Sequence, residues 1–162
     1  MKKTLIIIAA FIGVLFCAVG YSDSQYRTAI GRPAPALSVN TSDGPLNLDS
    51  LRGHYVLLNF WKSTDAPSRR TANDYTAWLR RHKNTDINLV SVNFDDSEAL
   101  YREIMRRDSL IPETQYHVAG DNARAIYDGY GLDKGLGTML ISPQGKILAH
   151  NPTWDQLNDI RR

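Results

Sequence analysis

Cysteine is almost absent from this sequence of 162 residues, in which Cys17 is the only thiol. A disulfide needs two thiols, and disulfide exchange needs a thiolate to attack sulfur and a second thiol to resolve the mixed disulfide. Because residues 18–162 contain no cysteine, we expect neither a disulfide nor thiol chemistry from them.

An excess of charge of one sign is also missing. The chain has 19 basic and 17 acidic residues, and two of the bases, Lys2 and Lys3, stand at the N-terminus. Beyond residue 20 the two signs therefore balance, which gives no electrostatic reason to expect nucleic acid as a partner. Histidines are few and isolated. None has metal-ligand spacing to another histidine or an acid, so we expect no metal site and no cofactor. The four are His54, His82, His117 and His150.

One long apolar run is present, over residues 5–16. It follows Lys2-Lys3 and precedes small residues at 18–20, the pattern of a secretory signal peptide. Three outcomes stay open, taken in this order: cleavage, lipid attachment at Cys17, and retention as an anchor. Retention is considered because residues 4–22 fall within the roughly 17–25 residues that span a bilayer. Each outcome places the rest of the chain in the periplasm or on the outer surface.

The remainder divides into a linker over residues 21–32 and one domain over residues 33–162, since this length suits a single core. Apolar spacing and turn residues predict a hairpin followed by two strand–helix units. A shorter helix, a second hairpin and a last helix come after them. The expected ranges are 37–51, 55–60, 64–83, 87–94, 97–111, 122–130, 138–149 and 153–161. This order predicts an α/β fold with a central mixed sheet flanked by helices and an N-terminal hairpin.

Several short sequence motifs occur in an order that resembles the thioredoxin superfamily, specifically its extracytoplasmic TlpA/ResA-like branch. They stand at residues 31–35, 57–61, 130–132, 138–141 and 145–147. The resemblance covers roughly residues 30–160. It implies a thioredoxin-like fold and membership of a family of thiol-disulfide oxidoreductases.

The chain departs from that resemblance where the family's chemistry lies. The family pattern F-W-x-x-W-C-x-P-C-R aligns with residues 60–69. Asp65 then stands in place of the nucleophilic cysteine and Ser68 in place of the resolving cysteine, while Pro67 and Arg69 are retained. Leu136 stands where the family has a proline with a cis peptide bond. A cis bond is costly without proline, so we expect a trans or reshaped loop there.

Asp65 is suited to a structural task at this position. A carboxylate at a helix N-terminus accepts hydrogen bonds from free N–H groups and complements the helix dipole. The other interpretation is a catalytic pair of Asp65 and Ser68, but a serine nucleophile needs a general base, and neither His54 nor His82 carries a motif that places it there. Thr64 is the alternative cap for this helix.

Two further features allow two interpretations each. Asp95 and Asp96 follow a predicted strand, where α/β proteins often bind ligands, but a loop and helix cap before Ser97 is the plainer interpretation. Trp61 either shapes a surface for a partner, as the resemblance implies, or belongs to the core.

The predicted function is therefore a redox-inactive, outside-facing domain that binds a protein or peptide of the cell envelope. The predicted binding residues are Trp61, Thr64, Asp65, Pro67 and Leu136. The chain would contact the membrane through its N-terminal segment if that segment is not cleaved. The alternatives are a divergent oxidoreductase or peroxidase-like enzyme that acts with a partner's thiols, and an accessory lipoprotein that presents a surface.

Overall fold

The computed structural model describes residues 27–41, 44–83 and 85–160. The segment expected to be a signal peptide or anchor, with Cys17, lies outside the described residues. Among the described helices, none combines the length and the apolar character needed to cross a membrane.

Five strands form the central sheet, in the spatial order β5-β4-β3-β6-β7. β3 and β5 both run parallel to β4, whereas β6 pairs antiparallel with β3 and with β7. The expected mixed sheet, with parallel crossovers first and an antiparallel hairpin last, is confirmed. The strands are β3 (Tyr55–Trp61), β4 (Ile87–Asn93), β5 (Gln115–His117), β6 (Thr138–Ile141) and β7 (Ile147–His150). The N-terminal hairpin is a separate two-stranded sheet of β1 (Ser38–Thr41) and β2 (Gly44–Asn47).

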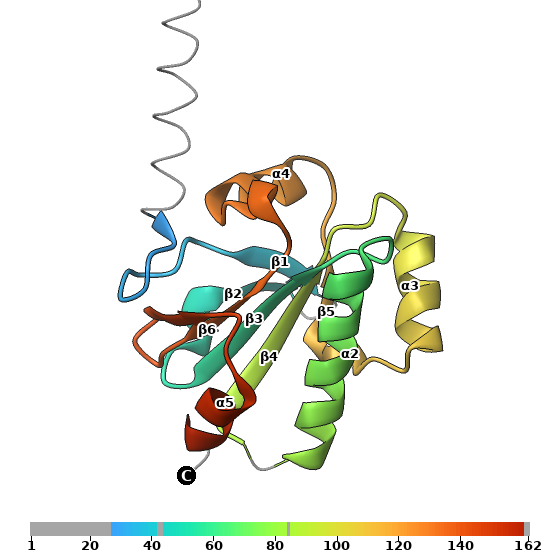
Figure 1. Cartoon of the computed structure of the whole chain (residues 1–162). Helices are drawn as coiled ribbons and strands as arrows, with labels where there is room; N and C mark the ends of the chain where they lie inside the picture. The colour runs from blue at the N-terminus through green and yellow to red at the C-terminus, as the bar shows by residue number, and fades with distance from the viewer. Residues whose placement is uncertain (1–26, 42–43, 84, 161–162) are drawn as a thin grey trace, which may run out of the picture.

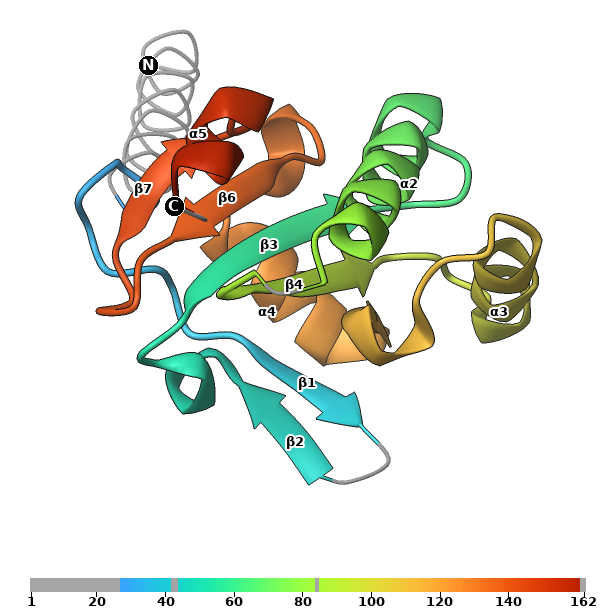
Figure 2. The ribbon, with the colours of Figure 1, turned by 90° about the horizontal axis from the view of Figure 1, so that it is seen from below.

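Helices lie on both faces of the sheet. Viewed from below, α2 and α5 cover one face, and α4 lies on the other beside the hairpin (Figure 2). The α-helices are α2 (Ala66–Arg81), α3 (Glu98–Arg107), α4 (Gly120–Gly129) and α5 (Trp154–Ile160). Short 3-10 turns are η1 (Leu48–Leu51), η2 (Pro112–Thr114) and η3 (Leu132–Lys134).

Alternation along β3 divides the core between these faces, because successive strand side chains point in opposite directions. Leu57 packs with residues of α2 and α5, whereas Val56, Leu58 and Phe60 pack with residues of α4 and the hairpin. All four side chains are almost completely buried. The run of apolar residues therefore indicates a strand covered on both faces, as predicted.

Local capping signals in the sequence are also confirmed. Ser97 caps α3, and its Oγ accepts a hydrogen bond from the Leu100 backbone N–H. At the start of α5, the Thr153 N–H donates to Gln156 Oε1 at 2.9 Å, and the Gln156 N–H donates to Thr153 Oγ1 at 3.3 Å. This reciprocal pair is a capping box.

Several expectations need correction. Helix α3 ends at Arg107, four residues before the expected end at 111. The strand β5 was not expected, because three residues are too few to show a periodic pattern. Helix α4 begins at Gly120, two residues earlier than expected. Two residues of the expected linker, Thr28 and Gly31, contact β7. The Gly31 N–H donates to the Ile147 carbonyl at 2.7 Å, and His150 Nε2 lies 2.7 Å from the Thr28 carbonyl oxygen.

Candidate functional site

The expected site lies at the carboxyl end of β3, where the chain passes into α2. Figure 1 shows this passage at the same end of the sheet as the loop from β4 to α3, with α4 nearby. The carboxyl ends of parallel strands are where α/β proteins commonly place their ligands. The geometry of the residues there decides which of the predicted roles each one can serve.

Asp65 is the N-cap of α2. Its Oδ1 accepts a hydrogen bond from the Ser68 N–H at 2.8 Å, and its carbonyl accepts the first helical hydrogen bond, from the Arg69 N–H. Hydrogen bonding to Ser68 holds the pKa of the exposed Asp65 carboxyl below its ordinary value. The side chain is therefore an anion at neutral pH. The prediction that Asp65 caps the helix is confirmed, and Thr64 does not serve as the cap.

Ser68 is buried and hydrogen-bonded within its own turn. It is 4 % exposed. Its Oγ accepts from the Lys62 N–H at 3.2 Å and lies 3.2 Å from the Asp65 carbonyl oxygen, to which it donates. Among the described residues, no histidine hydrogen-bonds to Ser68, and the hydroxyl donates to the Asp65 backbone carbonyl. These contacts fix the turn and give no support to a catalytic pair with Asp65.

Asp95 is the polar residue at this end of the sheet that the sequence interpretation underrated. It is 1 % exposed. Its carboxylate accepts from the Ser63 N–H at 2.8 Å and from Asn93 Nδ2 at 3.0 Å, and it also binds the Ser63 hydroxyl. Asp95 therefore ties the loop before α2 to the end of β4. Its place shortly after a buried strand is a weak signal for this role, because Ser63 lies 32 positions away in the chain.

Trp61 is wholly buried, at 0 % exposure, which corrects its prediction as a binding residue. Its ring lies 6.1 Å from that of Tyr101, in a cluster that also includes Ala72 and Ile104. The residue faces α2 and α3 rather than solvent, because β3 continues through position 61 and alternation turns this side chain inward. Trp61 is therefore a core residue.

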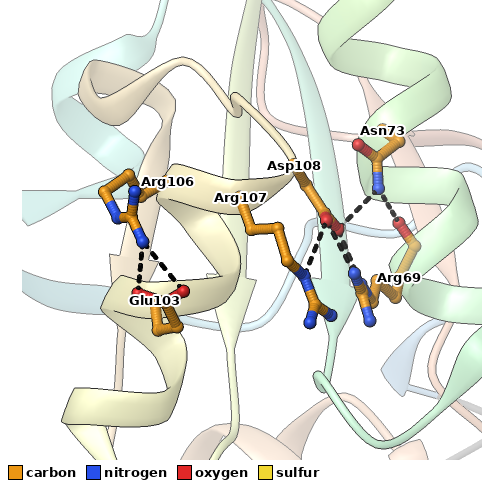
Figure 3. Close-up of polar contacts among 6 residues, drawn as sticks. All are labelled: Arg69, Asn73, Glu103, Arg106, Arg107 and Asp108. Carbon is orange, nitrogen blue, oxygen red and sulfur yellow. Dashed lines mark hydrogen bonds and ion pairs between the residues drawn. The ribbon is translucent and has the colours of Figure 1, made fainter.

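Arg69, the arginine retained from the family pattern, holds α2 to α3. Its Nε and one terminal nitrogen donate to the two Asp108 oxygens, each at 2.6 Å, and Asn73 Nδ2 donates to the same carboxylate at 3.1 Å (Figure 3). Arg107 contributes a longer contact of 3.8 Å. The hydrogen bonds from Arg69 are the largest cause that lowers the pKa of Asp108. This bidentate geometry is a strong form of ion pair.

A groove lies beside Asp65. Asp65, Phe94, Tyr127 and Leu136 line it, and its volume is about 550 Å³. We call it the Asp65–Leu136 groove. The Tyr127 ring, 37 % exposed, meets Phe94 edge-on with centroids 6.0 Å apart. The structure thus brings together two of the five predicted binding residues, Asp65 and Leu136.

The other predicted positions lie elsewhere. Thr64 is exposed and lines a separate shallow hollow together with Arg69 and Asp108. Pro67 is exposed in the first turn of α2, outside the lining of the Asp65–Leu136 groove. The half-buried Leu136 precedes β6, and none of the peptide bonds among the described residues is cis, as expected for a loop without proline. No group of residues suited to hold a metal ion occurs in the described ranges.

Comparison with known proteins identifies the family. The model of the AhpC/TSA family matches residues 30–150. The chain belongs to the AhpC/TSA family. It is 27 % identical over 154 residues to the thiol-disulfide oxidoreductase ResA of Bacillus subtilis, an alignment that covers 91 % of this chain and 84 % of ResA.

Solved structures agree with this assignment. A thioredoxin-like protein from Parabacteroides distasonis has a TM-score of 0.68 and 30 % identity, covering 82 % of this chain and 94 % of that one. A thiol:disulfide interchange protein from a Bacteroides species has a TM-score of 0.69 and 23 % identity, covering 82 % and 88 %, and shows the shared fold. The chain is therefore a thioredoxin-like member of the AhpC/TSA family, and the curated relatives it resembles are thiol-disulfide oxidoreductases.

Proposed function

We propose that this protein is a redox-inactive member of its family that binds a protein or peptide segment in the Asp65–Leu136 groove. The observation that carries the proposal is how Asp65 and Ser68 are hydrogen-bonded at the start of α2. Asp65 caps α2 through Ser68, and the Ser68 hydroxyl is buried in the same turn. Neither group can attack a disulfide sulfur or resolve a mixed disulfide, since both steps need a thiolate.

The groove supports the second half of the proposal. It is bordered by the helix start and by the Leu136 loop, and its lining includes a partly exposed aromatic residue, Tyr127. Concave surfaces that combine aromatic and aliphatic groups with a few polar ones are the usual form of a binding site. A surface of this kind does not depend on the lost cysteines.

The proposed location is outside the cytoplasm, in the periplasm or on the outer surface. The basic start, apolar run and small residues of the first twenty positions support export. Fusion of residues 1–32 to a reporter that is active only after export tests this location. An inactive fusion that accumulates in the cytoplasm would contradict it.

Redox activity is tested with the purified protein in an insulin-reduction assay and a peroxide-consumption assay. Both are expected to be blank. The matched variant carries Asp65→Cys, Ser68→Cys and Leu136→Pro, and it is expected to regain part of the insulin-reducing activity because the helix start is otherwise retained. Activity of the unaltered protein in either assay would favour the alternative, an enzyme that uses a partner's thiols.

Binding is tested by cross-linking in the native cell envelope, with a photoreactive amino acid introduced at position 136. The same group at position 148, exposed on β7, is the control. A cross-linked product specific to position 136, and weakened by Tyr127→Ala, is the expected result. Products of equal yield from both positions, or from neither, would reject the groove as the binding site.

A further inference from the structure

The Asp65–Leu136 groove has a local charge that the domain as a whole does not have. Carboxylates from four separate segments line it: Asp65, Asp96, Asp128 and Asp133. The basic side chains in its lining are Lys62 and Arg124. The lining therefore has an excess of two negative charges, although acidic and basic residues balance over residues 21–162.

The anionic state of this rim has structural causes. The cap hydrogen bonds at the start of α2 keep the pKa of Asp65 below its ordinary value. Lys62 Nζ lies 3.1 Å from Asp96 Oδ2, so this lysine is already paired within the rim. Asp128 and Asp133 are both exposed, on α4 and in η3. A cationic group in the groove would therefore approach carboxylates from more than one direction.

The groove also has apolar residues in its lining, which favour an apolar side chain in the partner. Phe94 and Leu136 are partly buried against the main core, and Tyr127 stands edge-on to Phe94. These apolar lining residues are held by the core behind them, so this part of the groove suits an aliphatic or aromatic side chain. Tyr127 is 37 % exposed, and a tyrosine ring attracts the guanidinium of arginine or the ammonium of lysine by a cation–π interaction when the cation lies over its face.

We infer that the occupant of the Asp65–Leu136 groove is a basic, apolar peptide segment, in which arginine or lysine flanks an aromatic or aliphatic residue. The apolar side chain rests on Phe94 and Leu136, and the cations face the carboxylate rim. This inference rests on the proposed function and adds the chemical class of the partner. Charge complementarity of this kind contributes specificity and a faster association rate.

The test uses a phage library of random twelve-residue peptides, panned against the full chain purified in detergent at low ionic strength. Enriched peptides are synthesised with a fluorophore, and their affinity is measured by fluorescence anisotropy. We expect the enriched pool to have a clear net positive charge with at least one aromatic or aliphatic residue. We also expect affinity to fall as salt is raised, because exposed charges are screened.

Paired variants locate the effect. The double variant Asp128→Asn/Asp133→Asn removes two rim carboxylates and is expected to weaken binding about three- to tenfold, because exposed ion pairs contribute modestly. The control, Asp74→Asn/Asp155→Asn, removes two exposed carboxylates that do not line the groove and is expected to leave affinity unchanged. Circular dichroism confirms that each variant is folded.

The outcomes separate this inference from the proposed function. Neutral or acidic peptides that bind, and that lose affinity on Tyr127→Ala, would overturn the basic partner while supporting the groove. Basic peptides affected equally by both double variants would also overturn it, because general charge attraction would then explain binding. If none of the enriched peptides loses affinity on Tyr127→Ala, that result contradicts both this inference and the proposed function.

Discussion

Two regions beside the start of α2 differ in how their polar groups are used: an inner side of buried residues and an outer side formed by the Asp65–Leu136 groove. On the inner side, Asp95 and Ser68 are buried and hydrogen-bonded to the loop before the helix. On the outer side, Asp128 and Tyr127 stand exposed around a groove. The inner side thus consists of contacts that hold the chain together, whereas the outer side leaves its groups available to a partner.

This difference bears on the proposed loss of the family's redox chemistry. A reactive helix start must leave its first residue accessible and activated, but Asp65 here uses its carboxylate to satisfy a backbone N–H. The groove beside it needs no such reactivity in order to bind. Stability and binding should therefore respond to different residues, and substitutions on the two sides can test that separation.

The largest effect is expected from Asp95→Ala. It leaves the Ser63 backbone N–H, the Ser63 hydroxyl and the Asn93 side-chain amide without their buried acceptor. This loss should lower the free energy of unfolding by about 3 kcal/mol. The neighbouring Asp96→Ala removes only an exposed ion pair with Lys62, worth less than about 1 kcal/mol. Urea denaturation measures both. Equal losses for the two variants would contradict the structural role of Asp95.

The next effect is expected from Asp108→Ala, which removes the bidentate partner of Arg69 and one acceptor of Asn73. Because the Asp108 side chain is only 10 % exposed, we expect a loss of about 2 kcal/mol. The control is Glu103→Ala, which breaks the exposed pair with Arg106 also drawn in Figure 3 and should cost less than about 0.5 kcal/mol. Thermal and urea unfolding should rank the two in this order, and the reverse ranking would reject the link between α2 and α3.

Asp65→Ala should cost about 1 kcal/mol, the usual contribution of an N-cap. The comparison Asp65→Asn isolates its charge. Because folding lowers the pKa of Asp65, the charge stabilises the protein fully above its ordinary pKa of 3.8, and this contribution is lost as the pH falls through the lower folded value. Urea denaturation should therefore show wild type and Asp65→Asn converging in acid. A gap that widens below pH 3.8 would contradict the cap as a carboxylate.

The smallest effect is expected on the outer side. Asp128→Asn/Asp133→Asn should change the free energy of unfolding by no more than about 0.5 kcal/mol, because both side chains are exposed. The same variant is expected to weaken peptide binding. A loss of stability comparable to that of Asp65→Ala, measured in the same urea series, would erase the distinction between a structural inner side and a binding outer side.

The sequence predicted well those elements whose signals are local. The strand β3 and the caps at Asp65 and Ser97 follow from an apolar run and from single residues beside it. The strand β5 did not follow, since three residues owe their extended form to pairing with β4. The groove was predicted only in part. Asp65 and Leu136 were named, but Tyr127 was not, because nothing near it in the chain indicates that α4 packs beside β4.

The sequence by itself determined the chemistry that residues 18–162 lack, and it determined the charge at the start of α2. A missing thiol and a carboxylate at an N-cap are properties of single positions, so no contact was needed to read them. Only the tertiary structure decided which polar groups are buried and hydrogen-bonded within the domain and which are exposed around the groove. Trp61 is buried in the core, and Asp128 lines the same groove as Asp65, because burial and proximity arise from segments that are distant in the chain.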